Sequence, residues 1–202
     1  MKLTLPLKGI GTVPGIYLTQ HFGEHLNDYS QFGMKGHNGV DWAAPLMTPI
    51  YAVHDGIIQF LTEETNYGTG YGKNIRMYFD EDGVTWDCIY GHLDHYEGLP
   101  RQVKQGDLIG YVDSTGFSTG NHLHFGIRKI INGAVVDYNN GYFGYIDPEP
   151  YFNMNEAQIV KSKFSDKVFW CYPMPDMDYL QKKANLEGVN MPIEIPDTDS
   201  LK

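Results

Sequence analysis

Short apolar segments with the patterning of β-strands recur along the first 150 residues of the chain. They are rich in β-branched and aromatic residues, they are short for helices, and turn residues separate them. The segments are Pro49–Val53, Gly56–Leu61, Asn74–Phe79, Thr85–Tyr90 and Leu108–Val112. Asp82 and Gly83 between two of them form a strong hairpin signal. The pattern predicts an all-β fold, mainly antiparallel and built in two layers.

The segment from Gly120 to Ile127 combines this patterning with candidate chemistry. Side chains alternate between the two faces of a strand, so His122 and His124 share one face. The apolar residues Leu123, Phe125 and Ile127 take the other. We therefore predict a strand with one face for the core and one for a functional site.

A second cluster lies far upstream, where His37 and Asp41 stand four residues apart. Imidazole nitrogens and carboxylate oxygens are zinc ligands, so the two clusters together predict a metal site. Two coordination schemes are open at this point. In one, all four side chains close a structural site; in the other, three bind and one position stays open for water, as a catalytic zinc requires.

Composition narrows the function classes. The chain has 202 residues, 42% of them apolar and 14% aromatic, which predicts one globular domain with a sizeable core. A net charge of -10 argues against a protein that binds nucleic acid or an anionic surface. Pro6 and Lys8 interrupt the N-terminal apolar residues, so we predict no signal peptide, and no segment has the length for membrane insertion.

The two cysteines, Cys88 and Cys171, have no CxxC partner, which excludes a zinc ribbon. We expect both to be free or simply packed. The two residues are far apart in the sequence, so the sequence leaves open whether they form a disulfide.

We expect three parts of the chain: a lead-in of residues 1–19, a β domain of residues 20–151 and an irregular C-terminal extension of residues 152–202. The extension contains four prolines, Pro173, Pro175, Pro192 and Pro196. It also has an apolar cluster at Val168–Trp170 and a possible short helix from Asp178 to Leu186. The apolar cluster either packs on the β domain or binds a partner, and packing is the more common outcome.

Several motifs in order resemble the M23 metallopeptidases, the lysostaphin-like and LytM-like endopeptidases that cut peptides in bacterial peptidoglycan. The matching elements are His37 to Asp41, Ala44 to Ala52, Tyr90 to Leu93 and Ser114 to Arg128. The resemblance covers roughly residues 20–151 and is specific, because separate elements recur in order. Two departures are visible. Asn121 stands where a proline is usual, and Gly126 stands where a glutamate often follows the phenylalanine.

The resemblance implies the M23 β scaffold and a role for each site residue. His37, Asp41 and His124 would bind Zn²⁺, and His92 and His122 would stand beside the water that the metal activates. Which of these two histidines is the general base is open. Tyr29 and Asn121 are further candidates for substrate binding or transition-state support.

The function implied is that of a zinc-dependent endopeptidase that hydrolyses amide bonds in peptidoglycan stem peptides or cross-bridges. The alternative is a catalytically silent M23-like module that binds or regulates a partner, or a phage structural module. The expected partner is a peptidoglycan peptide, and neither nucleic acid nor membrane is expected. With no leader predicted, action on the wall outside the cytoplasm would follow phage-type or other delivery. The sequence leaves open the oligomeric state and the choice between a glycine cross-bridge and a D-Ala-linked peptide.

Overall fold

The structure is a computed structural model that describes residues 1–11, 13–25, 28–63, 70–98, 100–152, 159–161 and 168–170. The strands are β1 (Tyr17–Gln20), β2 (Val40–Ala43), β3 (Pro49–Tyr51), β4 (Gly56–Glu63), β5 (Lys73–Glu81), β6 (Val84–Gly91), β7 (Leu93–Tyr96), β8 (Gln102–Val103), β9 (Leu108–Val112), β10 (His122–Ile131), β11 (Ala134–Val135), β12 (Tyr145–Ile146), β13 (Ile159–Lys161) and β14 (Val168–Trp170). Three 3-10 turns accompany them, η1 (Ser30–Phe32), η2 (Tyr138–Asn140) and η3 (Glu149–Tyr151).

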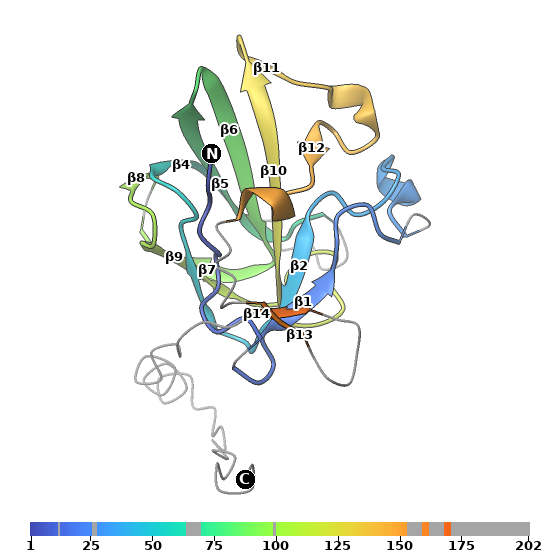
Figure 1. The fold of residues 1–202 in the computed structure, drawn as a ribbon, viewed down its shortest axis with the longest axis vertical. Coiled ribbons are helices and arrows are strands. Elements are labelled where there is room, and N and C mark those ends of the chain that lie inside the picture. Colours follow the sequence, from blue (N-terminus) through green and yellow to red (C-terminus); the bar gives the residue numbers. More distant parts are fainter. Residues whose placement is uncertain are drawn as a thin grey trace, which may run out of the picture.

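Two antiparallel sheets form the body of the fold (Figure 1). The large sheet has the order β1-β2-β10-β6-β5-β4-β8, with β11 and β12 also paired to β10. The small sheet has the order β3-β9-β7. This arrangement confirms the prediction of an all-β, mainly antiparallel fold in two layers.

The predicted hairpin is present between β5 and β6. Glu81 pairs with Val84, and the two turn residues both have left-handed backbones, with φ of 53° at Asp82 and 76° at Gly83. Positive φ at both central positions is the geometry of a type I′ turn, which matches the twist of the flanking strands. The Asp-Gly pair therefore sets the register of the hairpin that carries much of the large sheet.

The core contains one face of the large sheet and the apolar side chains of the small one. Along β10, Leu123, Phe125 and Ile127 are fully buried in it, as their alternation predicts. The first residues of the chain, expected as a lead-in, also contribute buried side chains to this core, namely Leu3, Leu5, Leu7, Ile10 and Ile16. Phe152 joins them and packs against Trp42. Residues on both sides of the predicted domain boundaries thus belong to one packed unit.

Cys88 is free and buried in this core, as expected. In the C-terminal extension, Val168–Trp170 forms β14, which pairs with β13, and its backbone lies beside β1 (Figure 1). The predicted helix from Asp178 to Leu186 and Cys171 lie outside the described residues.

The opposite face of the large sheet carries a buried ion cluster across three neighbouring strands. The Asp87 side chain on β6 is completely buried. One of its carboxylate oxygens accepts hydrogen bonds from Arg76 on β5 at 2.9 Å and from Arg128 on β10 at 2.8 Å. Two guanidinium groups satisfy the carboxylate, so the cluster connects the central strands on the site face.

Replacing Asp87 with alanine is expected to lower the free energy of unfolding by about 3 kcal/mol, because removal of one partner leaves Arg76 and Arg128 without their shared counter-ion. Urea unfolding followed by circular dichroism measures this change. Asp55→Ala is the matched control, since Asp55 pairs with Lys104 on the exposed surface and such pairs contribute little. Equal unfolding midpoints for the two variants would contradict the structural role of Asp87.

Candidate metal centre

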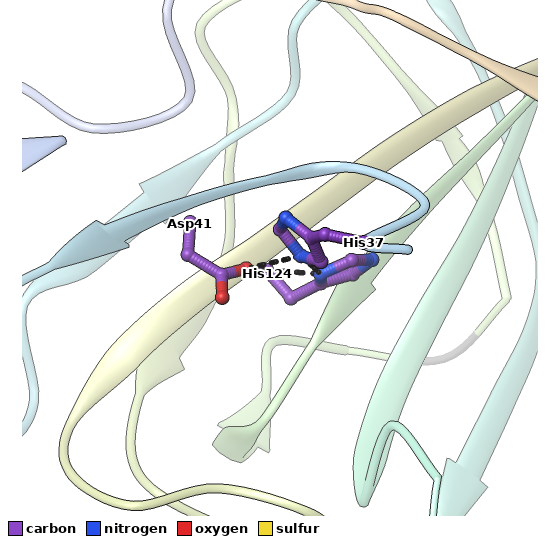
Figure 2. Close-up of side chains that lie close together, drawn as sticks. All are labelled: His37, Asp41 and His124. Atoms are coloured by element: carbon purple, nitrogen blue, oxygen red, sulfur yellow. Dashed lines mark hydrogen bonds and ion pairs between the residues drawn. The ribbon is translucent and has the colours of Figure 1, made fainter. Parts of the chain in front are cut away.

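Three ligand-type side chains converge where β2 and β10 pair. His124 on β10 lies directly opposite Asp41 on β2, and His37 lies in the loop just before β2 (Figure 2). Nδ1 of His124 is 2.9 Å from Oδ1 of Asp41 and 2.9 Å from Nε2 of His37. The same Nε2 is 3.1 Å from Oδ1 of Asp41. All three residues are buried, and these atoms form a triangle of nearly equal edges.

The hydrogen-bond partners of His37 indicate why this triangle fits a cation. Nδ1 of His37 donates to the carbonyl oxygen of His21 at 3.1 Å, so in the neutral ring Nε2 holds a lone pair. An ionised Asp41 also presents only lone pairs. When the ring is neutral, two acceptors thus face each other at 3.1 Å with no proton between them. A cation on which all three atoms converge removes this repulsion, and two imidazoles with one carboxylate are donors that zinc accepts.

The electrostatics keep the cluster in a ligand-competent state. Burial alone would raise the pKa of the Asp41 carboxyl, but the neighbouring His124 and His37 outweigh burial and hold the pKa well below its ordinary value. Burial lowers the pKa of His124 from 6.5 to about 4, against the raising effect of Asp41. A carboxylate and a neutral imidazole both offer lone pairs, as metal ligands must.

Two further histidines flank the cluster. His92, between β6 and β7, donates from Nδ1 to the carbonyl oxygen of Thr115 at 2.6 Å, and His122 donates from Nδ1 to that of Gly120 at 2.8 Å. Their rings lie 4.5 Å apart between centroids. Because Nδ1 of each ring faces a carbonyl oxygen, the neutral form of each ring carries its lone pair on Nε2, and Nε2 of His122 is 3.5 Å from Oδ2 of Asp41.

His92 occupies an unusual and buried position. Its φ is 64°, a left-handed backbone that few non-glycine residues adopt and that often accompanies functional sites. Two backbone hydrogen bonds hold this conformation. The His92 amide donates to the Tyr71 carbonyl oxygen, and the His92 carbonyl oxygen accepts from the Asp113 amide. Burial, together with the neighbouring His122 and His124, lowers the pKa of His92 to about 3, so the ring is neutral.

The loop between β9 and β10 positions both flanking histidines. Its Thr115 and Gly120 carbonyl oxygens are the acceptors for His92 and His122. Gly116 has a φ of 77°, and a Cβ there would lie 2.3 Å from the amide nitrogen of Gly72. Glycine is required at this point because two backbones approach closely in a left-handed turn.

A pocket of about 720 Å³ opens in front of these groups and is lined by Asp41, His92, His122 and His124. Tyr29, one of the two further candidates, also lines it, and its hydroxyl donates to Gln20 at 3.1 Å. Asn121, the other candidate, is exposed and is not among the described residues that line the pocket. The exposed His25, to which the sequence assigns no role, lies on the pocket wall.

Tyr71 and Asn38 complete the surroundings, and sequence reasoning missed both. The Asn38 side chain donates to the Tyr71 hydroxyl, and the Tyr71 ring packs 5.1 Å from that of His124. Tyr71 falls in a stretch that looks like loop variation and belongs to no periodic pattern, so nothing in the sequence singles it out. The position of Asn38 beside His37 was the available signal.

The fold and the site define a β protein with a candidate catalytic metal centre in a pocket on one face of its large sheet. The chain belongs to peptidase family M23, whose family model matches residues 35–138, about half of the chain. The resemblance inferred from the motifs is therefore confirmed.

Named relatives and solved structures agree with this membership. DD-carboxypeptidase/endopeptidase Mpg of Neisseria meningitidis is 41% identical over 101 residues, which are 50% of this chain and 21% of that protein. Lysostaphin of Staphylococcus simulans is 35% identical over 126 residues, with coverages of 56% and 24%. The chain thus spans about a quarter or less of the length of these curated relatives.

Two solved structures have a similar fold. The catalytic domain of the prophage-encoded M23 protein EnpA from Enterococcus faecalis has a TM-score of 0.51 and 27% identity, covering 69% of this chain and 93% of that one. LytU has a TM-score of 0.51 and 32% identity, with coverages of 69% and 86%. Among the described residues, no helix is long and apolar enough to cross a membrane.

Replacing Gly39 with alanine is expected to weaken the binding of added Zn²⁺ roughly ten- to a hundredfold, the usual effect of disturbing groups that orient metal ligands. A Cβ at Gly39 would lie 2.4 Å from the carbonyl oxygen of Phe125 and 2.7 Å from Cε1 of His124. Competition with a zinc-responsive dye measures the affinity. Gly120→Ala is the control, because its Cβ would meet nothing within 4 Å. Unchanged affinity in a folded Gly39→Ala protein would contradict this packing argument.

Proposed function

We propose that this protein is a zinc-dependent endopeptidase that hydrolyses amide bonds in peptidoglycan peptides. The observation that carries the proposal is the convergence of His37, Asp41 and His124 beside two histidines whose Nδ1 atoms donate to backbone carbonyl oxygens. Asp41, His124 and the two flanking histidines line one pocket that is large enough for a peptide segment.

His37, Asp41 and His124 would hold the zinc ion through Nε2, Oδ1 and Nδ1. When bound, the ion supplies a Lewis acid for the peptide carbonyl and lowers the pKa of a water molecule to roughly 7. Two histidines and one carboxylate also bind iron in some oxygenases. Zinc is favoured because a pair of base-type histidines beside the donors has an evident use in hydrolysis.

His92 and His122 would move protons at Nε2. Their Nδ1 protons are held by backbone carbonyl oxygens, so each ring keeps a fixed tautomer and orientation as it accepts and returns a proton. Tyr29 would act as a hydrogen-bond donor to the developing oxyanion. Burial and the nearby Asp41 raise the pKa of its hydroxyl, so it stays protonated at neutral pH.

The substrate class comes from the relatives and from the charge of the pocket. One relative is named a peptidoglycan DD-endopeptidase, ShyC of Vibrio cholerae, and another a glycyl-glycine endopeptidase, ALE-1 of Staphylococcus capitis. No lysine or arginine is among the described residues that line the pocket, whereas Asp28 and Asp41 are. A terminal carboxylate would find no cationic partner there, which favours cleavage of internal amides over removal of a C-terminal residue.

A catalytically silent module that binds a partner is the second candidate, since silent copies of enzyme folds exist on many scaffolds. The presence of all five site residues argues against it, because binding alone needs neither an open metal position nor both flanking histidines. Asp41, His92, His122 and His124 line one pocket, and His37 contacts Asp41 and His124.

We also propose that the protein is a phage lysin or a virion-associated wall hydrolase, because EnpA, a structural relative, is described as prophage-encoded. The neighbouring genes test this point. Phage structural or lysis genes beside the coding sequence would support it, and a chromosomal setting among cell-division genes would refute it.

His124→Ala and His122→Ala are expected to separate metal binding from turnover. His124→Ala removes a ligand, so zinc content and activity both fall to background. His122→Ala leaves the three ligands in place, so the protein keeps about one zinc per chain while the rate falls by roughly 10²–10⁴-fold, the usual contribution of a general acid or base. Elemental analysis of purified proteins and peptide hydrolysis assays measure both quantities. Equal loss of zinc in the two variants would overturn this assignment of roles.

Digestion of purified cell walls of several chemotypes, followed by mass analysis of the released peptides, tests the proposed function directly. The expected result is release of peptides cut at internal amides, abolished by a zinc chelator and restored by added Zn²⁺. Zinc binding without release of peptide from any wall would favour the silent module. Restoration by Fe²⁺ alone would refute zinc dependence.

A further inference from the structure

One wall of the pocket is aromatic and is assembled from three separate segments. Phe32, Phe117 and Phe143 all line the pocket and are partly exposed to it. The Phe32 and Phe117 rings pack edge to face with centroids 5.1 Å apart. The outer end of the Phe143 ring lies 3.7 Å from where a Cβ at Gly33, the neighbour of Phe32, would be. We call these three rings the aromatic wall.

The wall adjoins the catalytic side of the pocket. Ser118 follows Phe117 in the chain, and its Oγ is 3.2 Å from Nδ1 of His122. Phe32 belongs to η1, which follows directly after Tyr29. An extended peptide placed for reaction at His122 would therefore have one of its flanking residues beside the wall.

Phe143 is held in place at an energetic cost. Its φ is 54°, which is a genuine outlier for a bulky aromatic residue and persists only where the surroundings fix it. The guanidinium group of Arg128 donates to the Phe143 carbonyl oxygen at 3.3 Å. The side-chain oxygen of Asn140 accepts hydrogen bonds from the amides of Tyr142 and Gly144, on either side of Phe143. Strain maintained in this way at a pocket wall indicates a functional position for the ring.

The segment that carries Phe143 packs near Gly126 on β10, one of the two positions that depart from the usual motif. A Cβ at Gly126 would lie 3.0 Å from the ring of Tyr145 and 3.0 Å from the Asn38 carbonyl oxygen, so a larger residue there would require these neighbours to shift. Arg128 in turn lies over the Tyr145 ring at 4.9 Å. Gly126 and the segment around Phe143 thus fit each other, and the ring of Tyr145 lies between Gly126 and Arg128.

We propose that the aromatic wall binds the alkyl side chain of a substrate residue next to the scissile amide, and that the substrate is therefore an alanine-containing peptide link rather than an all-glycine cross-bridge. A methyl group gains by leaving water for the wall, whereas glycine has no side chain to bury. The wall is uncharged, and no cation is among the described lining residues, so an apolar substituent is the group it suits. This specificity rests on the proposed endopeptidase function.

Two capped peptides that differ only at the flanking residue, D-alanine in one and glycine in the other, test the proposal. The unmodified protein is expected to cleave the alanine peptide with a kcat/KM about tenfold higher or more, the lower end of what one methyl group contributes in an apolar pocket. Phe143→Gly removes the ring and relieves the left-handed strain. It is expected to raise KM for the alanine peptide about tenfold and to change kcat/KM for the glycine peptide less than twofold.

Phe143→Leu keeps an apolar side chain and should retain most of the preference, which separates contact with the wall from general damage to the segment. Tyr17→Ala is the matched control, because Tyr17 is an exposed aromatic residue on β1 that is outside the pocket lining. It should leave both peptides unaffected. Equal cleavage of the two peptides by the unmodified protein, or an equal loss for both in Phe143→Gly, would refute the role of the wall.

Binding of both peptides to the His122→Ala protein, measured by calorimetry with and without Phe143→Gly, separates this proposal from the proposed function. A preference for the alanine peptide that disappears with Phe143→Gly supports the wall even if the unmodified protein hydrolyses neither peptide. Such a result would refute the proposed endopeptidase function and leave the role of the aromatic wall intact. Binding without a preference would refute the wall, whatever the activity.

Discussion

The register of β10 between β2 and β6 is the constraint on which the site depends. His124 pairs with Asp41 on one side and with Gly91 on the other. A Cβ at Gly91 would lie 3.4 Å from that of His124, so the two positions are in direct van der Waals contact across the sheet. A shift of one residue in this register would turn His122 and His124 into the core and expose Leu123 and Phe125. The burial of Leu123 and Phe125 therefore fixes the position of the candidate ligands.

The converging donors are costly to keep together, and the surrounding structure maintains them. A buried carboxylate and two imidazoles would separate or change protonation in a deformable site. Here Asp41 and His124 are held by the sheet, and His37 is held by its bond to the carbonyl oxygen of His21. The backbone of His37 is fixed in turn by two hydrogen bonds, because the Gly23 amide donates to the His37 carbonyl oxygen and the His37 amide donates to the Glu24 carbonyl oxygen. This preorganisation leaves the site with three lone pairs directed at one point.

Sequence reasoning predicts well those parts of the structure that depend on local pattern. The alternation in β10 gives both faces of the strand, and Asp82 with Gly83 gives the hairpin turn. The grouping of His37 with the distant His124 follows from the motif order, and the structure brings them together. The contribution of Leu3, Leu5 and Leu7 to the core is not predicted in this way. These residues do alternate with other positions, but the segment is short and Pro6 interrupts it, so sequence reasoning predicts only a lead-in there.

The features that distinguish this chain arise where tertiary contacts override local signals. Gly126 looks in the sequence like a simple loss of a side chain, yet in the structure it makes room for Tyr145. The buried Asp87 then orients Arg128, which binds the Phe143 carbonyl oxygen and so connects the ion cluster of the sheet to the pocket. Within the large sheet, β10 thus carries the candidate ligand His124 and, four residues on, the anchor of the aromatic wall. Because both lie on the same face of one strand, the register that brings the ligands together also sets the position of the wall relative to them.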